Sequence, residues 1–201
     1  MTPYDAAAVA ALIRAAFAVQ SVPTDPPASA LGLTAADVRA HLEAGGGGAV
    51  IEEAAVMVAS VLWSQEDAGL AVARLAVAPA SRRRGHARAL LAAAEDAARV
   101  AGLAQLHLGT RLALVDNRRL FAEAGFVEVA RHAHPGYAEP TWVAMAKRLA
   151  VRPISHPAQQ PTRMDGSASV GARSGGHTGV PQGVGHPALR KARCFLVRGA
   201  S

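Results

Sequence analysis

The sequence predicts an α/β fold in which a mostly antiparallel, mixed sheet is flanked by helices. Apolar residues recur at helical spacing in some segments and alternate with polar residues in others. These segments follow one another in the order helix, helix, three strands, helix, strand, helix, two strands. The composition changes near residue 150, which predicts a folded domain over residues 1–149 and a separate tail over residues 150–201.

Two helices are expected before residue 45. The first covers residues 5–19, where one stripe is apolar: Val9, Leu12, Ile13, Ala16 and Phe17. Residues 20–33 contain three prolines and therefore form a connection rather than a helix. Thr34, three residues before Asp37, is typical of a helix start and predicts a short second helix over residues 35–44.

The sheet is expected from the segments that follow a run of four glycines at 45–48. A hairpin, a third strand and a helix come first, and a further strand, a helix ending at Gly125 and a final strand pair complete the domain. The predicted strands cover residues 49–52, 55–63, 70–77, 105–109, 126–131 and 141–147, and the helices between them cover 87–101 and 116–124.

Residues 75–100 join a strand, a basic loop and a helix. Pro79 ends the strand, and Gly85 allows backbone N–H groups to approach a ligand closely. A helix start also offers unpaired N–H groups and the positive end of the dipole, which together favour an anion such as phosphate. The alternative to an anion site is that Gly85 only relieves a tight turn and that the neighbouring arginines form a solvated surface. Four arginines surround the helix start: Arg82, Arg83, Arg84 and Arg88.

Two motifs resemble those of the GNAT-type N-acetyltransferase family. Arg82-x-x-Gly85-x-Ala87, which follows a strand ending in Leu-Ala-Val, is similar to the acyl-CoA-binding motif of that family. The run from Asp116 to Phe126, with its Gly-Phe ending, resembles the later helix. The resemblance covers about residues 5–149 and implies the family fold. Family members usually begin with a strand, for which only residues 1–4 are available, so that strand is expected to be short or missing, or the start of the sequence is incomplete.

The resemblance implies transfer of an acetyl group from acetyl-CoA to a primary amine of a small molecule or peptide, without a metal. Backbone N–H groups from Arg83 to Arg88 would hold the pyrophosphate, and the strand end would pair with the pantetheine arm. A non-catalytic acyl-CoA-binding module and a site for another phosphate ligand or nucleic acid are the alternatives. The implied donor-binding residues are Leu75, Ala76, Val77, Arg82, Arg83, Arg84, Gly85, His86, Ala87, Arg88, Asn117 and Phe121. Asn117 is alternatively a helix N-cap, which its neighbour Asp116 favours.

The acid and the base stay open at this stage. Phe121 stands where many family enzymes carry a tyrosine that protonates the thiolate, and Tyr137 is the best substitute, unless it only packs at the rim. The candidate bases are Glu52, Glu53, Asp67, His107, His132 and His134, since histidine has a suitable unperturbed pKa. Spacing does not show which face of a strand each occupies. Arg74 either binds an acceptor carboxylate or pairs with a neighbouring acid.

The net charge of +6 resides in the tail. Residues 1–150 contain 14 basic and 14 acidic residues, whereas the tail contains seven basic residues and one acidic residue. The domain is therefore not expected to bind nucleic acid. The lone Cys194 excludes an intramolecular disulfide and a cysteine-clustered zinc site.

No signal peptide or membrane span is apparent, so a cytoplasmic location is expected, and a homodimer is left open. The Gly- and Pro-rich tail is expected to be disordered. It either contacts nucleic acid or an acidic membrane, or is an accidental extension of the gene.

Overall fold

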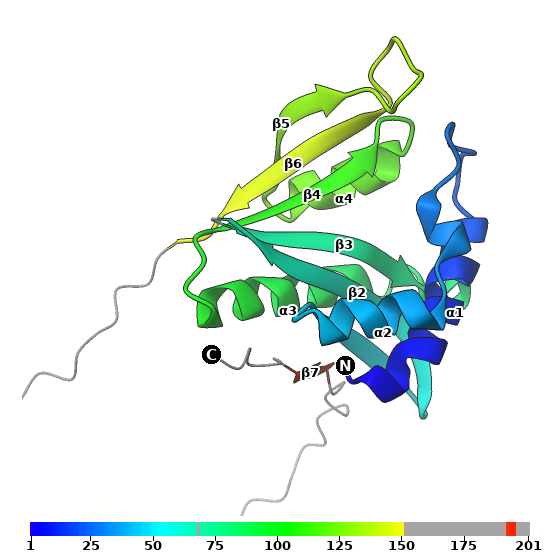
Figure 1. Ribbon diagram of the computed structural model, residues 1–201, viewed down its shortest axis with the longest axis vertical. Coiled ribbons are helices and arrows are strands. Elements are labelled where there is room, and N and C mark those ends of the chain that lie inside the picture. The colour runs from blue at the N-terminus through cyan, green and yellow to red at the C-terminus, as the bar shows by residue number, and fades with distance from the viewer. Residues whose placement is uncertain (68, 151–191, 196–201) are drawn as a thin grey trace, which may run out of the picture. The chain divides into compact units, whose positions relative to one another are not determined.

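The computed structural model describes residues 1–67 and 69–150, together with the backbone of residues 192–195. All of these residues belong to one compact unit. Helices and strands follow the predicted order (Figure 1). The helices are α1 (Ala6–Ala18), α2 (Ala35–Glu43), α3 (His86–Val100) and α4 (Val115–Glu123), with 3₁₀ turns at Pro3–Asp5, Ser29–Gly32 and Pro79–Ser81. The strands are β1 (Gly47–Glu53), β2 (Val56–Glu66), β3 (Gly69–Val77), β4 (Gln105–Arg111), β5 (Val127–His132), β6 (Trp142–Arg148) and β7 (Ala192–Phe195).

The strands form one sheet in the order β5-β6-β4-β3-β2-β1-β7, with every neighbouring pair antiparallel except β3 and β4. This confirms the mostly antiparallel, mixed sheet. The parallel pair is short, because only Leu70 pairs with Leu106 and Ala71 with His107. Beyond these residues β3 stays with β2 while β4 stays with β6, so the two strands diverge (Figure 1).

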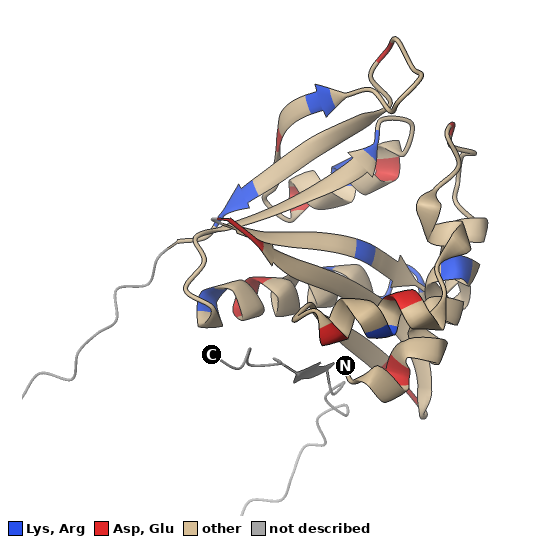
Figure 2. Cartoon of the chain, viewed as in Figure 1, with Lys and Arg blue, Asp and Glu red and all other residues tan. Residues whose placement is uncertain are grey.

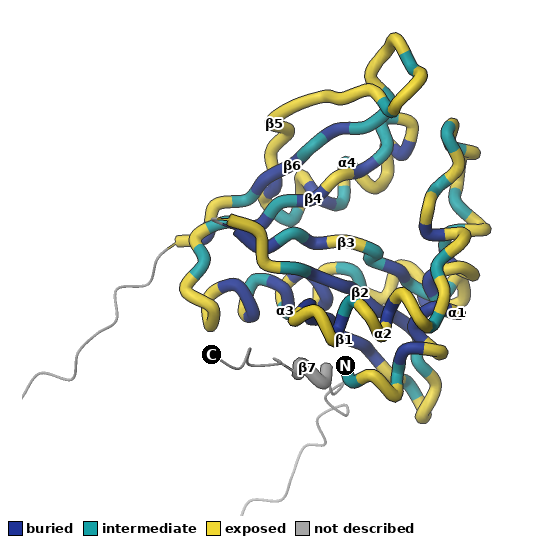
Figure 3. The backbone as a smooth tube through the Cα atoms, in the orientation of Figure 1, coloured by how far each residue is buried: buried dark blue, intermediate teal, exposed yellow. Residues whose placement is uncertain are grey.

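Helices cover both faces of the sheet, each over its own apolar core. On one face α3 buries Leu90, Leu91 and Ala94 in a cluster that also contains Phe121 of α4. On the other face α1 and α2 bury a second cluster, which includes Val9 and Ile13 of α1 and Val38 and Leu42 of α2. Burial follows these two layers, with exposed residues on the outer sides of the helices (Figure 3). Removing a leucine such as Leu90 from water stabilises the fold by about 1.5–3 kcal/mol.

In the described part of the chain no strand precedes α1, and residues 3–5 form a 3₁₀ turn. The outer edge of β1 is paired antiparallel with β7, in a register that places Ala49 opposite Cys194. The composition of the tail predicts disorder for these four residues. A four-residue strand is too short to produce a detectable alternation. The rest of the predicted disordered tail lies outside the described residues. The domain boundary at residue 149 stays a prediction.

Basic and acidic residues are interspersed over the described part of the chain (Figure 2). None of its helices is long and apolar enough to cross a membrane. A cytoplasmic location, a homodimer and the absence of nucleic-acid binding stay predictions.

Candidate active site

A β-bulge shapes β3 at the point where it leaves β4. Ser60 of β2 pairs with Ala76, but Leu62 pairs with Ala73, so β3 contains one extra residue between these pairs. Within that stretch Arg74 has φ 53°, in the left-handed region that non-glycine residues rarely adopt. Such a conformation costs on the order of 1–3 kcal/mol and is often found at functional sites. The bulge bends the strand next to Leu75, Ala76 and Val77, the predicted donor-binding segment.

The loop after β3 leads into α3 through two left-handed residues, Arg83 (φ 60°) and Gly85 (φ 83°). Gly85 is the N-cap of α3 and has no side chain with which to cap the helix. The first N–H groups of this 15-residue helix are therefore available to an anion. A Cβ atom built on Gly85 would have no atom within 4 Å, so the space in front of the helix is open.

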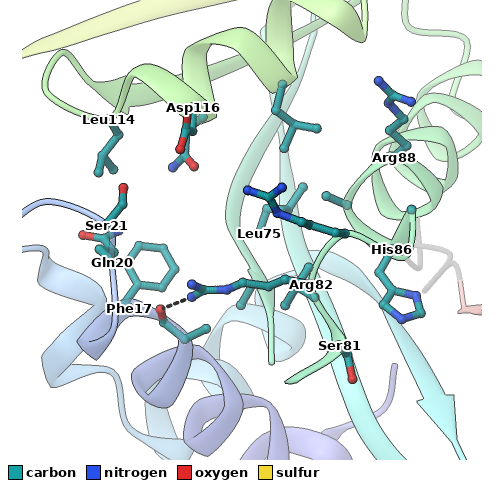
Figure 4. A pocket seen from close by; sticks show the side chains of 18 residues that line it. Phe17, Gln20, Ser21, Leu75, Ser81, Arg82, His86, Arg88, Leu114 and Asp116 are labelled. Atoms are coloured by element: carbon teal, nitrogen blue, oxygen red, sulfur yellow. Dashed lines mark hydrogen bonds between the residues drawn. The ribbon is translucent and has the colours of Figure 1, made fainter. Parts of the chain in front are cut away.

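Most of the loop arginines already have protein partners. Arg82 extends to the end of α1, where its Nη2 donates to the Ala16 carbonyl (3.1 Å) and its Nη1 to the Val19 carbonyl (3.3 Å) (Figure 4). Arg84 pairs with Glu53 at 3.1 Å and Arg88 with Glu123 at 2.6 Å. His86 is buried, with its Nε2 3.3 Å from the Glu53 carboxylate.

A first cavity of about 650 Å³, hereafter the donor cavity, lies in front of this helix start. Figure 4 shows Phe17, Gln20 and Ser21 from the end of α1 on one side of it and Leu114 and Asp116 from the start of α4 on another. Of the twelve predicted donor-binding residues, only Arg84 and Phe121 do not line it. The ten that do are Leu75, Ala76, Val77, Arg82, Arg83, Gly85, His86, Ala87, Arg88 and Asn117.

A second cavity of about 350 Å³, hereafter the acceptor-side cavity, lies between the diverging strands. Arg74 of β3, Arg111 at the end of β4, and His134 and Trp142 line it, and Phe121 lies in its wall. Both cavities share five lining residues and therefore adjoin at the mouth of the diverging strands: Phe17, Gln20, Leu75, Leu114 and Asn117.

His134 is held by Arg111. The Arg111 Nη1 lies 3.0 Å from Nδ1 of His134, and the Thr141 hydroxyl lies next to the same nitrogen. Because a guanidinium only donates hydrogen bonds, Nδ1 must accept, which assigns the proton of the neutral ring to Nε2. Burial first, and the Arg111 charge second, lower the pKa of His134 below its ordinary value.

The remaining candidates for acid and base lie elsewhere. Tyr137 donates its hydroxyl proton to the Asp25 carboxylate, and this bond, followed by burial, raises the pKa of Tyr137. His107 contacts Glu66 (2.9 Å), and Glu53 contacts Arg84. His132 stacks on Trp142, with ring centroids 4.4 Å apart. Glu52, Glu53, Asp67, His107, His132 and Tyr137 are not among the residues that line either cavity.

Asn117 is not a helix cap. The N-cap of α4 is Leu114 and the helix begins at Val115, so Asn117 is its third residue and lines both cavities. The cap prediction was wrong because the helix starts at Val115, one residue before the Asp116–Asn117 pair that favoured it. Phe121 is buried and packs edge to face on Phe126, with centroids 6.1 Å apart.

Sequence reasoning missed Arg111, Leu114 and Trp142 as lining residues. Leu114 lines both cavities as the N-cap of α4. Arg111 carried no local signal, because it joins the site only through the pairing of β3 with β4. Among the described residues no group of three His, Cys, Asp or Glu could hold a metal ion.

Comparisons with known structures agree with this architecture. The chain is similar to a putative acetyltransferase of the GNAT family from Desulfovibrio desulfuricans (21% identity, 73% of this chain, 93% of that chain, TM-score 0.60). It is also similar to the ribosomal-protein-S18-alanine N-acetyltransferase from Escherichia coli (19% identity, 78% of this chain, 95% of that chain, TM-score 0.60). A third similar structure is the PaiA N-acetyltransferase from Thermoplasma acidophilum in complex with coenzyme A (11% identity, 74% of this chain, 96% of that chain, TM-score 0.61). At these identities the likeness establishes the fold. No curated protein sequence matches this chain.

The model of the Acetyltransferase (GNAT) family matches residues 12–126, more than half of the sequence. The match begins within α1, spans the bulged strand, the uncapped helix start and α4, and ends at Phe126. The open helix start and the diverging strands fit acetyl-CoA, the acyl donor of this family. The chain therefore belongs to the GNAT family and is an acetyl-CoA-dependent acetyltransferase.

Proposed function

We propose that the protein transfers an acetyl group directly from acetyl-CoA to a primary amine of a small molecule or peptide. The observation that supports this most is the meeting of the donor cavity and the acceptor-side cavity beside Leu75 and Asn117. Direct transfer requires both substrates at one point, with the amine within reach of the thioester carbonyl.

The donor is held mainly by main-chain groups. The N–H groups from Arg83 to Arg88 would bind the pyrophosphate at the start of α3, where Gly85 leaves room for close approach. The end of β3 has left β4, so its edge from Leu75 to Val77 can pair with the pantetheine arm as an added strand would. A backbone N–H near Ala76 or Val77 would then polarise the thioester carbonyl.

In the transfer, the amine nitrogen forms a bond to the acetyl carbon, and the bond from that carbon to sulfur breaks. The thiolate leaves as coenzyme A and takes up one proton, while the nitrogen loses one as the amide forms. Phe121 has no proton to supply, so water protonates the thiolate, which is only a moderate base.

No aspartate or glutamate lines the acceptor-side cavity in the described part of the chain, so solvent is the proposed acceptor of the ammonium proton. His134 has its free electron pair on Nδ1, which Arg111 occupies, so this ring suits a hydrogen-bond donor to the acceptor better than a base. The proton then passes to solvent.

The test is release of coenzyme A thiol from acetyl-CoA in the presence of a panel of primary amines, with formation of the N-acetyl product followed by mass spectrometry. We expect thiol release that depends on the amine and is absent from the Gly85→Glu variant. The alternative is a non-catalytic acyl-CoA-binding module, which the aromatic Phe121 favours because it cannot act as an acid. That alternative predicts acetyl-CoA binding by calorimetry without thiol release for any amine.

A further inference from the structure

The acceptor-side cavity is cationic. Arg74 and Arg111 contribute two guanidiniums to its wall, and none of its lining residues is an aspartate or a glutamate. Its other polar groups are neutral hydroxyls, amides and rings, such as Ser29, Asn117 and His134. A polycationic acceptor would bring further positive charge into this space.

Neither guanidinium has a carboxylate partner within 4.0 Å in the described part of the chain. Arg74 donates to the Ser29 hydroxyl at 3.1 Å, and Arg111 donates to His134 and to the Pro27 carbonyl at 3.3 Å. By contrast, six other arginines of the same part form carboxylate ion pairs: Arg84, Arg88, Arg99, Arg118, Arg119 and Arg131.

The nearest acids are already engaged. Asp37 acts on Arg74 only at a distance, because its carboxylate accepts bonds from the Thr34 N–H (2.8 Å) and hydroxyl (2.7 Å). Asp25 acts on Arg111 but accepts the Tyr137 hydroxyl proton. Burial lowers the pKa of both arginines, so each is a partly desolvated cation without a contacting anion.

The backbone fixes where these cations lie. Arg74 is held at the bulge in a left-handed conformation, and Arg111 ends β4, so they stand on the two strands that diverge around the cavity. A group bound between them would lie next to Leu75, where the acetyl carbonyl is expected. The volume of about 350 Å³ is near the lower end of the roughly 300–1,000 Å³ of ligand sites, which favours a small acceptor.

We infer that the acceptor is a small primary amine that also carries a carboxylate, as an amino acid does, and that Arg74 and Arg111 bind this carboxylate. The inference rests on the proposed N-acetyltransferase function. Arg74 uses only Nη1 in its bond to Ser29, which leaves Nε and Nη2 for an oxygen pair of the acceptor. The bound carboxylate orients the amine of the same molecule toward the donor cavity.

The experiment compares acceptors that differ only in this group. Each of the common amino acids is offered beside its carboxamide and its decarboxylated amine, and thiol release gives kcat and KM for each. We expect the carboxylate form to have a kcat/KM at least roughly tenfold higher than either neutral form, because bonds to charged groups contribute about 1.5–3 kcal/mol each.

Three cavity variants and one surface control locate the effect. Arg74→Ala and Arg111→Ala are each expected to raise KM for the carboxylate acceptor by roughly 10- to 100-fold. KM for the carboxamide and the Kd for acetyl-CoA should stay within about twofold. Arg74→Lys should recover part of the lost affinity for the carboxylate acceptor, since lysine retains the positive charge but cannot form the paired hydrogen bonds of a guanidinium. Arg39→Ala removes an exposed arginine of α2 that lines neither cavity, and should change nothing.

The outcomes separate the two proposals. Turnover of neutral or polycationic amines at rates equal to or above those of the carboxylate forms overturns the carboxylate site and leaves the N-acetyltransferase function standing. Equal effects of Arg74→Ala on carboxylate and carboxamide acceptors would also overturn it. No thiol release with any amine, despite acetyl-CoA binding, contradicts the proposed function itself.

Discussion

The donor cavity and the acceptor-side cavity use arginine in opposite ways. Around the donor cavity Arg82 binds the carbonyls at the end of α1, while Arg84 and Arg88 pair with Glu53 and Glu123. In the acceptor-side cavity Arg74 and Arg111 contact only neutral partners. Arg82, Arg84 and Arg88 thus hold the loop in place, whereas Arg74 and Arg111 are available to a ligand.

This difference predicts how each substrate is recognised. The donor is bound mostly by backbone N–H groups and by the strand edge, which depend on backbone shape and little on any one side chain. The acceptor is bound by side chains, which a single substitution removes. Substitutions at the donor cavity should therefore strongly weaken acetyl-CoA binding only where they alter the backbone or fill the space in front of it. Substitutions at the acceptor-side cavity should instead change which acceptor is used.

The largest effect is expected from Gly85→Glu. The substitution places a negative charge and bulk before the α3 N-terminus, where the pyrophosphate would lie, and like charges in contact cost several kcal/mol. We expect the affinity for acetyl-CoA, measured by calorimetry, to fall by at least about 100-fold. Gly85→Ala is the matched control, because its Cβ meets no atom within 4 Å. It should bind within a few-fold of wild type while losing about 1–2 kcal/mol of stability to the left-handed φ. Unchanged affinity in Gly85→Glu would refute this site.

A smaller effect is expected from Arg82→Ala. The variant loses the two bonds that tie the loop to the Ala16 and Val19 carbonyls, and we expect the free energy of unfolding to fall by about 1 kcal/mol. Thermal unfolding should show a Tm lower by about 2–4 °C. Affinity for acetyl-CoA should fall by a few-fold only. Arg82→Lys, which can still reach one carbonyl, should recover part of the stability. A loss of affinity as large as that of Gly85→Glu would show that Arg82 binds the donor directly.

A third prediction concerns the pH response of the acceptor-side cavity. Burial, followed by the charge of Arg111, lowers the pKa of His134 from its ordinary value of 6.5, so the folded chain favours the neutral ring. This stabilisation is fully present above pH 6.5 and is lost as the pH falls through the lower folded-state pKa, because the unfolded chain binds the proton first. NMR titration of the ring should give a pKa below 6.5, which rises in Arg111→Ala but stays depressed by the remaining burial. A pKa unchanged by Arg111→Ala would contradict the contact.

Sequence patterns predicted the donor side because its parts are contiguous. The strand end, the arginine loop, Gly85 and the helix start all lie within residues 75–100, where local rules on proline, glycine and helix termini apply. The order of helices and strands was predicted for the same reason, because each element is a contiguous segment with its own periodicity. The Asn117 cap was wrong because capping preference does not fix which residue starts a helix, and Leu114 took that place.

The acceptor side could not be predicted in the same way. Arg74, Arg111 and His134 are distant in sequence and meet through the short parallel pairing of β3 with β4 and the connection between β5 and β6. Arg74 was considered as a carboxylate ligand, but its lack of an acidic contact is a property of the fold alone. The edge pairing of β7 with β1 is equally non-local.

The smallest effect is expected from Tyr137→Phe. Tyr137 was the best substitute for the acid that Phe121 lacks, but its proton is directed to Asp25, and the resulting rise in its pKa makes it a weaker acid. We expect kcat to stay within about twofold of wild type, with a small decrease in Tm from the missing bond. Steady-state kinetics over a range of pH, combined with thermal unfolding, measures both. Asp25→Asn is the matched control, since it removes the charge that Tyr137 contacts while leaving the phenol. If kcat instead falls more than about tenfold in Tyr137→Phe, and its alkaline limb disappears from the pH profile, then Tyr137 protonates the thiolate after a movement of its loop, and the acceptor side supplies the acid as well as the carboxylate site.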